Sequence, residues 1–385
     1  ALLIQTQVLK SWNWNRNYSV KYDLTQALKF DYTGQAKALI GEPAGVIPTQ
    51  EGDLEGYNFY TDTVRTNLLG AGDITSYNHN ANGSYKLPFD KIPLMDFVTG
   101  DVRYQSSFRW DRAPFAQDTL GSTIQNSRNL SLNGQANFLK LYNKVPFLKK
   151  INNKRPKRPT SSNASNQSRD GFGELKDEEK KEKIEINPIE HILRFVMGVQ
   201  SISGSFSRNE GILLPGFSET SKYGGFDENL ESPGILFLLG HQNTDVFGNK
   251  SSDFAMDAAA NGWLVRQPYL NQQYTESFTE NFNVRMNLEP IKHFKIELTA
   301  NRSTSRNYQS FFRYDEEFDD WIYESPNETG NFTATVMSWP TAFIDDDEEY
   351  NSEIWDDLLL SRLEISSRLN EENFNLDDPN PTGYY

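Results

Sequence analysis

The sequence predicts an all-β protein and, within that class, favours a segment of an antiparallel transmembrane β-barrel. First, apolar and polar residues alternate over runs longer than the typical globular strand of about 5–6 residues. Second, short turns alternate with long loops, which is typical of outer-membrane barrels. Third, aromatic residues make up 13% of the 385 residues, yet no stretch approaches the roughly 20 apolar residues of a membrane helix. A soluble β-sandwich also alternates and is the alternative.

The clearest strand is expected at Val98–Trp110. Successive side chains of a strand point to opposite sides, so the apolar and polar residues of this run separate onto two faces. A strand that crosses a membrane needs about 9–11 residues, and this run is long enough to do so. The same alternation predicts eight further strands, at Tyr18–Leu24, Leu28–Tyr32, Tyr77–Leu87, Leu130–Phe138, Ile202–Phe206, Phe278–Leu288, Ile296–Ala300 and Phe332–Val336.

The connections between these strands differ in length. Short turns are expected near Thr25, at Phe89–Asp96 and at Glu289–Phe294, and long loops at Gly41–Gly72, Asp111–Gln125 and Asn209–Gln273. In outer-membrane barrels the short turns are periplasmic and the long loops extracellular. We therefore expect the two longest loops to lie at the cell surface, where they close over or frame the pore exit. Their glycine and aromatic content is equally consistent with a purely structural packing role.

The chain is expected to contain four parts. Residues 1–148 hold barrel strands with their loops, and residues 188–340 hold the remaining strands with the long extracellular loop 209–273. Between them, residues 149–187 are rich in charge, serine and asparagine, which predicts a flexible insert on the periplasmic side. Residues 341–385 combine an acidic loop with an amphipathic helix at Glu353–Leu369, expected to be periplasmic. The acidic run Asp345–Glu349 lacks the spacing and glycine of a known calcium loop, so a solvated loop is favoured.

The composition argues against catalysis and against nucleic-acid binding. The net charge of −15 repels phosphate backbones, and the absence of cysteine excludes thiolate metal sites and cysteine nucleophiles. The four histidines are scattered without a zinc-like spacing, and the glycines form no phosphate-binding loop. We therefore expect neither an enzyme nor a cofactor, and we expect no metal site and no nucleic-acid partner.

The two faces of the strands are the expected carriers of function. Mixed charges with many Asn and Ser residues suit a wide aqueous passage rather than a specific ion site. The expected pore-facing residues are Asp101, Arg103, Gln105, Arg109, Asn133, Gln135, Ser203 and Arg285. The expected lipid-facing residues are Val102, Tyr104, Phe108, Leu130, Leu132 and Val284. Nine strands leave two open edges, which cannot persist in a bilayer. We therefore expect the chain to be a piece of a longer polypeptide.

Several sequence blocks resemble the SprA/Sov family, and they occur in the family's order over most of the chain. The blocks are Asn13–Tyr18, Tyr22–Thr25, Ala27–Tyr32, Glu42-Pro43 with Gly45, Lys140–Lys150, Leu213–Phe217, Leu288–Pro290, Leu298–Arg302 and Phe312–Tyr314. This family forms the outer-membrane translocon of the type 9 secretion system in Bacteroidota. Members are several times longer than this chain, so the resemblance implies that the chain acts together with the rest of its polypeptide.

The resemblance implies a single very large barrel, of the class whose largest known example has about 36 strands. It implies location in the cell outer membrane, export of folded proteins through the barrel pore, and a role in gliding motility in gliding species. It also implies partners: a smaller outer-membrane barrel that acts as a shuttle, a periplasmic plug protein and secreted cargo proteins. Two other readings of the chain stay open, a segment of a nutrient-uptake receptor barrel and a soluble β-rich glycan-binding or adhesin module.

Overall fold

The computed structural model describes residue 10 and residues 12–114, 119–153, 197–245, 248–291, 294–336 and 352–362. The chain divides into two compact units, residues 1–334 and 335–385. The first unit contains the whole β-sheet. In the second unit, residues 353–362 form a helix, which lies within the stretch where the sequence predicts one. The other residues of the predicted acidic loop and helix lie outside the described residues.

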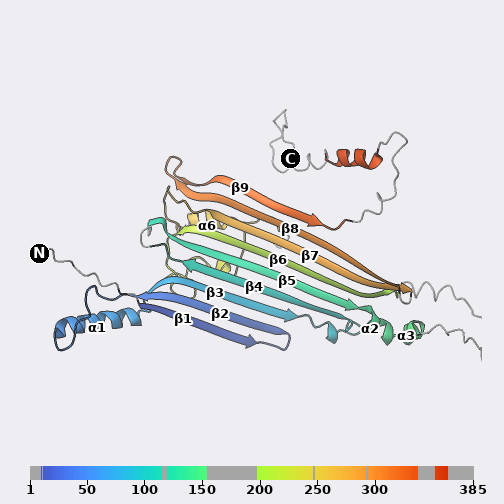
Figure 1. The fold of residues 1–385 in the computed structure, drawn as a ribbon, viewed down its shortest axis with the longest axis horizontal. Coiled ribbons are helices and arrows are strands. Elements are labelled where there is room, and N and C mark those ends of the chain that lie inside the picture. Colours follow the sequence, from blue (N-terminus) through green and yellow to red (C-terminus); the bar gives the residue numbers. More distant parts are fainter. Residues whose placement is uncertain are drawn as a thin grey trace, which may run out of the picture. The chain divides into compact units, whose positions relative to one another are not determined.

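The first unit is built on one antiparallel sheet of nine strands in sequence order, from β1 to β9 (Figure 1). This confirms the all-β prediction and the nine predicted strands. The strands are β1 Trp12–Asp23, β2 Leu28–Ile40, β3 Asp73–Lys86, β4 Val98–Asp111, β5 Ser122–Asn137, β6 Val199–Phe217, β7 Tyr274–Ile291, β8 Phe294–Asp315 and β9 Asp320–Ala334. Within the described residues the sheet is open, since β1 and β9 each pair with one neighbour.

Several strands are longer than the sequence predicts. Strand β6 continues to Phe217, so the connection predicted at 209–273 begins after that residue. Strands β8 and β9 extend toward each other until only the turn between Asp315 and Asp320 separates them. The alternation that signals a strand weakens in both places. At the end of β6 Ile212, Leu213 and Leu214 are apolar on either face, and in β8 and β9 aromatic or charged residues occur on both faces. Pairing with the preceding strand nevertheless keeps the backbone extended.

Short helices occupy the connections. They are α1 Leu54–Leu69, η1 Phe89–Lys91, α2 Phe138–Lys144, α3 Pro146–Asn153, α5 Ile235–Leu238 and α6 Phe254–Ala260. Helix α1 lies in the loop predicted at Gly41–Gly72, and the carboxylate of Asp53 caps it by accepting the Gly56 N–H at 2.9 Å. Helix α3 includes residues 149–153, the first residues of the predicted insert, and residues 154–187 lie outside the described residues. In the described parts of the chain, no helix has the length and apolarity needed to cross a membrane.

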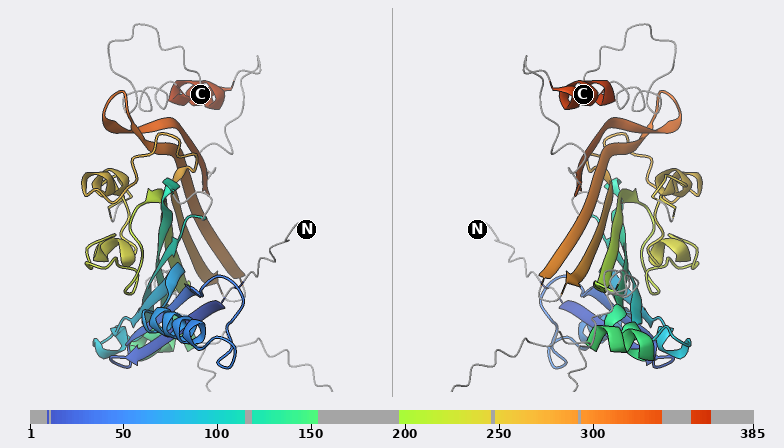
Figure 2. Two further views of the ribbon diagram at one scale, coloured as in Figure 1. Left: turned by 90° about the vertical axis from the view of Figure 1, so that its left-hand side faces the viewer. Right: turned by 90° about the vertical axis from the view of Figure 1, so that its right-hand side faces the viewer.

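The sheet is curved, and α5 and α6 lie on its convex side (Figure 2). Both helices belong to the connection between β6 and β7, residues 218–245 and 248–273, which we call the outer cover. The main hydrophobic core lies between the outer cover and the sheet. It includes Phe108, Trp110 and Tyr274 from the strands and Phe237 and Leu238 from α5. The ring of Phe237 stacks on that of Phe254 with centroids 3.9 Å apart.

Candidate functional site

The opposite, concave face of the sheet is a continuous polar wall. Strand alternation and strand register together build it, because polar residues that alternate along one strand lie beside polar residues of the next. One row across the sheet pairs Gln135 with Ser203, and Ser203 with Arg285. The next row pairs Asp101 with Asn133. A one-residue slip in any pairing would move apolar residues onto this wall, so the register is well specified.

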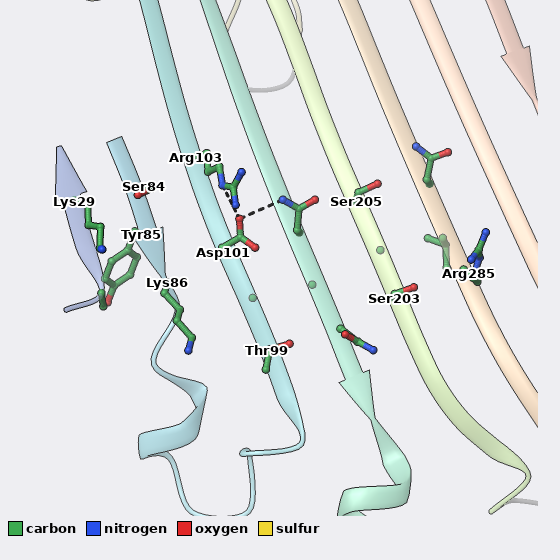
Figure 3. A pocket seen from close by; sticks show the side chains of 18 of the residues that line it. Lys29, Ser84, Tyr85, Lys86, Thr99, Asp101, Arg103, Ser203, Ser205 and Arg285 are labelled. Atoms are coloured by element: carbon green, nitrogen blue, oxygen red, sulfur yellow. Dashed lines mark hydrogen bonds and ion pairs between the residues drawn. The ribbon is translucent and has the colours of Figure 1, made fainter. Parts of the chain in front are cut away.

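The polar wall is hollowed into a trough of about 1040 Å³ (Figure 3). Its lining comes from seven neighbouring strands, from Lys29 on β2 to Asn301 on β8. Among the lining residues the one aromatic side chain is Tyr85. The trough is therefore broad, hydrophilic and almost free of sites for hydrophobic contact.

Several charges on this wall occur in neighbouring pairs of opposite sign. The Arg103 guanidinium lies 3.2 Å from the Asp101 carboxylate, and Asp101 also accepts a 3.2 Å hydrogen bond from the Asn133 amide. Arg285 and Glu297 are 3.0 Å apart on β7 and β8. Arg109 and Asp111 form a third pair on β4. Close pairing weakens the long-range field of each of these charges. Lys86 also lines the trough and forms no ion pair among the described contacts.

The middle of the wall carries no charge at all. On β5 every inward residue from Gln125 to Gln135 is Gln, Asn or Ser, and on β6 every inward residue from Ser201 to Asn209 is Ser or Asn. Neighbouring side chains bond to one another across strands: the Ser107 and Ser127 hydroxyls are 2.6 Å apart, and Ser303 donates to Asn281 at 2.7 Å. These groups hydrogen-bond readily to water and attract neither sign of charge.

All eight residues predicted to face a pore lie on this wall. Six of them line the trough itself: Asp101, Arg103, Asn133, Gln135, Ser203 and Arg285. Gln105 and Arg109 share the same face further along β4, toward the long connections. The structure therefore brings six of the predicted residues into one hollow. The residues that periodicity did not single out, such as Thr99, Ser205 and Asn301, follow from the register of the neighbouring strands.

Five of the six residues predicted to face lipid lie on the convex face outside the outer cover. Val102 pairs with Leu132 and Tyr104 with Leu130, while Val284 lies opposite Gly204. Tyr104 is 37% exposed and Leu132 39% exposed. We call the outward apolar residues of this zone the apolar band; on β4–β8 they are Val98, Val102, Tyr104, Leu130, Leu132, Ala136, Ile202, Phe206, Phe282, Val284, Met286, Ile296 and Leu298.

Phe108, the sixth residue, shares this face but is only 1% exposed. The expectation that it contacts lipid is wrong for this structure, because the outer cover encloses it. The Phe237 ring of α5 meets the Phe108 ring edge-on with centroids 6.1 Å apart. Gly225 of the outer cover also passes so close that a Cβ there would lie 3.1 Å from the Phe108 ring. Alternation gives the face on which a residue lies but does not give what covers that face.

Hydrogen bonds from the strands fasten the outer cover to the sheet. The Asn126 amide donates to the carbonyls of Phe237 at 3.1 Å and His241 at 2.9 Å. The Trp110 indole N–H donates to the Glu219 carbonyl at 3.0 Å. At the edge of the outer cover that borders the apolar band, the Tyr104 hydroxyl donates to the Leu239 carbonyl at 2.5 Å. The described part of this connection thus packs against the outside of the sheet, and this arrangement favours the structural role over a gate across the pore exit.

Beneath the outer cover lie charged residues that the sequence reading missed. Arg128 on β5 is 2.5 Å from Glu210 on β6, and Thr244 of the outer cover donates a further hydrogen bond to Glu210. Next to them, Arg208 lies 2.6 Å from Glu280 on β7. A signal for this zone exists in the sequence, since these charges stand at outward positions where the alternation otherwise places apolar residues. Charged residues at outward positions on adjacent strands therefore indicate where the apolar band ends and the enclosed part of the sheet begins.

The described residues contain no cluster of three His, Asp or Glu side chains suited to holding a metal ion. No protein-family model matches the chain, and no curated protein matches it either.

Proposed function

We propose that this chain forms part of the wall of a very large barrel in the bacterial outer membrane, through which folded proteins are exported. The observation that carries the proposal is the opposition of the two faces. A polar trough, in which most charges are paired, occupies the concave side, and the apolar band occupies the convex side. In water the band would be an unfavourable exposed apolar surface, whereas lipid would cover it.

The height of the apolar band supports a membrane span. On β5 the outward residues from Leu130 to Ala136 carry no charge, and on β7 the same holds from Phe282 to Leu288. With the inward residues that flank them, residues 129–137 of β5 and 281–289 of β7, these stretches are comparable to the about 9–11 residues of a tilted membrane-spanning strand. The strands continue beyond the apolar band and run beneath the outer cover. This part of the barrel wall would therefore lie in water outside the membrane.

The open edges of the sheet support the proposal that other strands complete it. Each unpaired backbone N–H or C=O in hydrocarbon costs several kcal/mol, so β1 and β9 need further partners in a bilayer. We propose that the rest of a long polypeptide supplies them, as the resemblance to the SprA/Sov family implies. On the same basis we propose a shuttle barrel, a periplasmic plug and secreted cargo as partners, and a role in type 9 secretion and gliding motility.

The chemistry of the trough suits passage of proteins better than capture of a ligand. A surface rich in Asn, Ser and Thr, whose charges are mostly paired, holds water and offers a passing protein little hydrophobic or ionic attachment. A sugar-binding module would need exposed aromatic rings in its hollow for stacking on sugars. Here most exposed aromatic residues of the strands, including Tyr104 and Phe282, lie on the opposite face.

Photo-crosslinking in cells tests this proposal with neighbouring positions as matched controls. A photo-reactive amino acid at Asn133 faces the trough, and the same group at Leu132 faces the apolar band. During secretion, we expect the probe at position 133 to crosslink to exported proteins, identified by mass spectrometry, and the probe at position 132 not to do so. If position 133 never captured an exported protein in secreting cells, or if both positions captured it equally, the proposal would be overturned.

A further inference from the structure

The segments that precede β4 and follow β5 lie at the same end of these strands. They form a basic element that pore formation does not explain. Helices α2 and α3, which directly follow β5, contain four lysines and no acidic residue, although the chain as a whole has a net charge of −15. Lys140 and Lys149 are exposed, and Lys91 in the neighbouring turn is exposed as well. Together with the turn 89–97, which adds Asp90 and Asp96 to Lys91, α2 and α3 form what we call the basic foot; its five lysines outnumber its two aspartates.

The basic foot is fixed to the sheet by its own small core. Phe138 and Leu139 pack on the buried pair Tyr142 and Met197. The Tyr142 hydroxyl donates to the Val199 carbonyl at 3.1 Å, which ties α2 to the beginning of β6. Because these contacts hold one side of α2 rigidly, the residues on the other side keep a constant position relative to the strands.

The basic foot also exposes apolar side chains. Phe147 on α3 is 58% exposed, and in the adjacent turn Ile92 is 47% and Leu94 65% exposed. The two parts are joined by an ion pair between Lys144 and Asp96 and by the Phe97 and Phe138 rings, whose centroids are 5.6 Å apart. The exposed apolar residues therefore belong to one rigid element rather than to separate loops.

We propose that the basic foot is a lipid-binding surface, which inserts Phe147, Ile92 and Leu94 at the edge of the adjacent leaflet and binds anionic headgroups through Lys140 and Lys149. Exposed apolar side chains flanked by lysines are the pattern of elements that lie in a membrane interface. Lysine stems extend along the apolar layer while their ammonium groups reach the headgroups. Each lysine near an anionic membrane surface adds to the attraction. The inference rests on the proposed membrane location, since it assigns the leaflet next to the apolar band as the occupant.

Single-cysteine labelling tests this inference, because the chain itself has no cysteine. In the assembled barrel, with cysteines elsewhere in the protein removed, we would attach an environment-sensitive fluorophore to Phe147→Cys. The barrel would be placed in vesicles of phosphatidylcholine, with or without phosphatidylglycerol and brominated lipid. We expect blue-shifted emission and quenching by brominated lipid, both stronger with phosphatidylglycerol. The variant carrying Lys140→Glu and Lys149→Glu should lose the dependence on phosphatidylglycerol.

Two control positions separate failure of this inference from failure of the proposed function. Phe59→Cys on α1 is at the end of the strands opposite the basic foot and should remain in water. Leu132→Cys in the apolar band should be quenched by brominated lipid whether or not the basic foot binds lipid. Quenching at 132 but not at 147 would overturn the lipid-binding proposal alone, and absence of quenching at 132 would overturn the membrane location. Protection of position 147 from both aqueous and lipid quenchers would mean that a protein covers this surface, which also overturns the proposal.

Discussion

The convex face of the sheet contains two zones that the same strands cross in succession. In the apolar band, side chains such as Leu132 and Phe282 are exposed and uncharged. Under the outer cover, outward positions of the same strands hold buried Phe108 and Trp110 together with the Arg128 and Glu210 ion pair. The same alternation of outward and inward residues therefore continues through an exposed zone and an enclosed zone. The zones differ in whether the protein itself encloses its outward residues.

The ion pairs offer the largest expected contrast. In Glu210→Ala the guanidinium of Arg128 remains beneath the outer cover without its carboxylate, so the free energy of unfolding should fall by about 3–5 kcal/mol. The matched control is Glu297→Ala, which removes the partner of Arg285 on the polar wall, where both side chains are more than half exposed. It should cost about 0–1 kcal/mol. Urea titration of the folded barrel measures both, and equal losses would contradict the division into an enclosed zone and an open zone.

Introducing arginine probes the apolar band directly. Val102→Arg should destabilise the barrel in lipid by about 2–4 kcal/mol if position 102 lies near the bilayer midplane. Gln105→Arg adds the same side chain to the same strand but on the polar wall, where water solvates it, and should change little. The fraction of heat-resistant folded barrel after refolding into vesicles provides the measurement. Equal loss in both variants would mean that the two faces do not differ in solvent.

The smallest expected effect comes from the border between the two zones. Tyr104→Phe keeps the ring in the apolar band but removes the hydroxyl that donates to the Leu239 carbonyl, which should cost about 0.5–1.5 kcal/mol. The loss should be local, so amide hydrogen exchange should accelerate at residues 235–240 and remain unchanged in β4. Tyr22→Phe on the exposed part of β1 is the control and should leave the exchange of α5 unaltered. Unchanged exchange in the Tyr104→Phe variant would show that this bond does not fasten the outer cover.

The sequence predicts the sheet well because alternation is a local property that pairing then enforces. The Val98–Trp110 run predicts β4 to within a residue, and the polar positions Asp101, Asn133 and Ser203 lie on one wall as expected. The outer cover could not be found in the same way. Its contact with the sheet joins residues far apart in the chain, such as Asn126 and His241, and neither residue shows any periodic signal. Phe108 is apolar at an outward position and would fit lipid or a protein core equally well.

The order of the strands also determines how such a wall can change in size. Each strand from β1 to β9 pairs with its neighbours in sequence. In pairs such as β1 with β2 and β7 with β8, the two strands form a hairpin that meets over a short stretch of chain. Contacts of this kind form with little loss of chain entropy, and an assembly machinery can receive the hairpins one after another. Duplication of one hairpin would widen the circumference by two strand spacings, about 9–10 Å, without altering any other pairing. In the proposed barrel, pore size would therefore follow the number of hairpins, which gene duplication can raise in even steps.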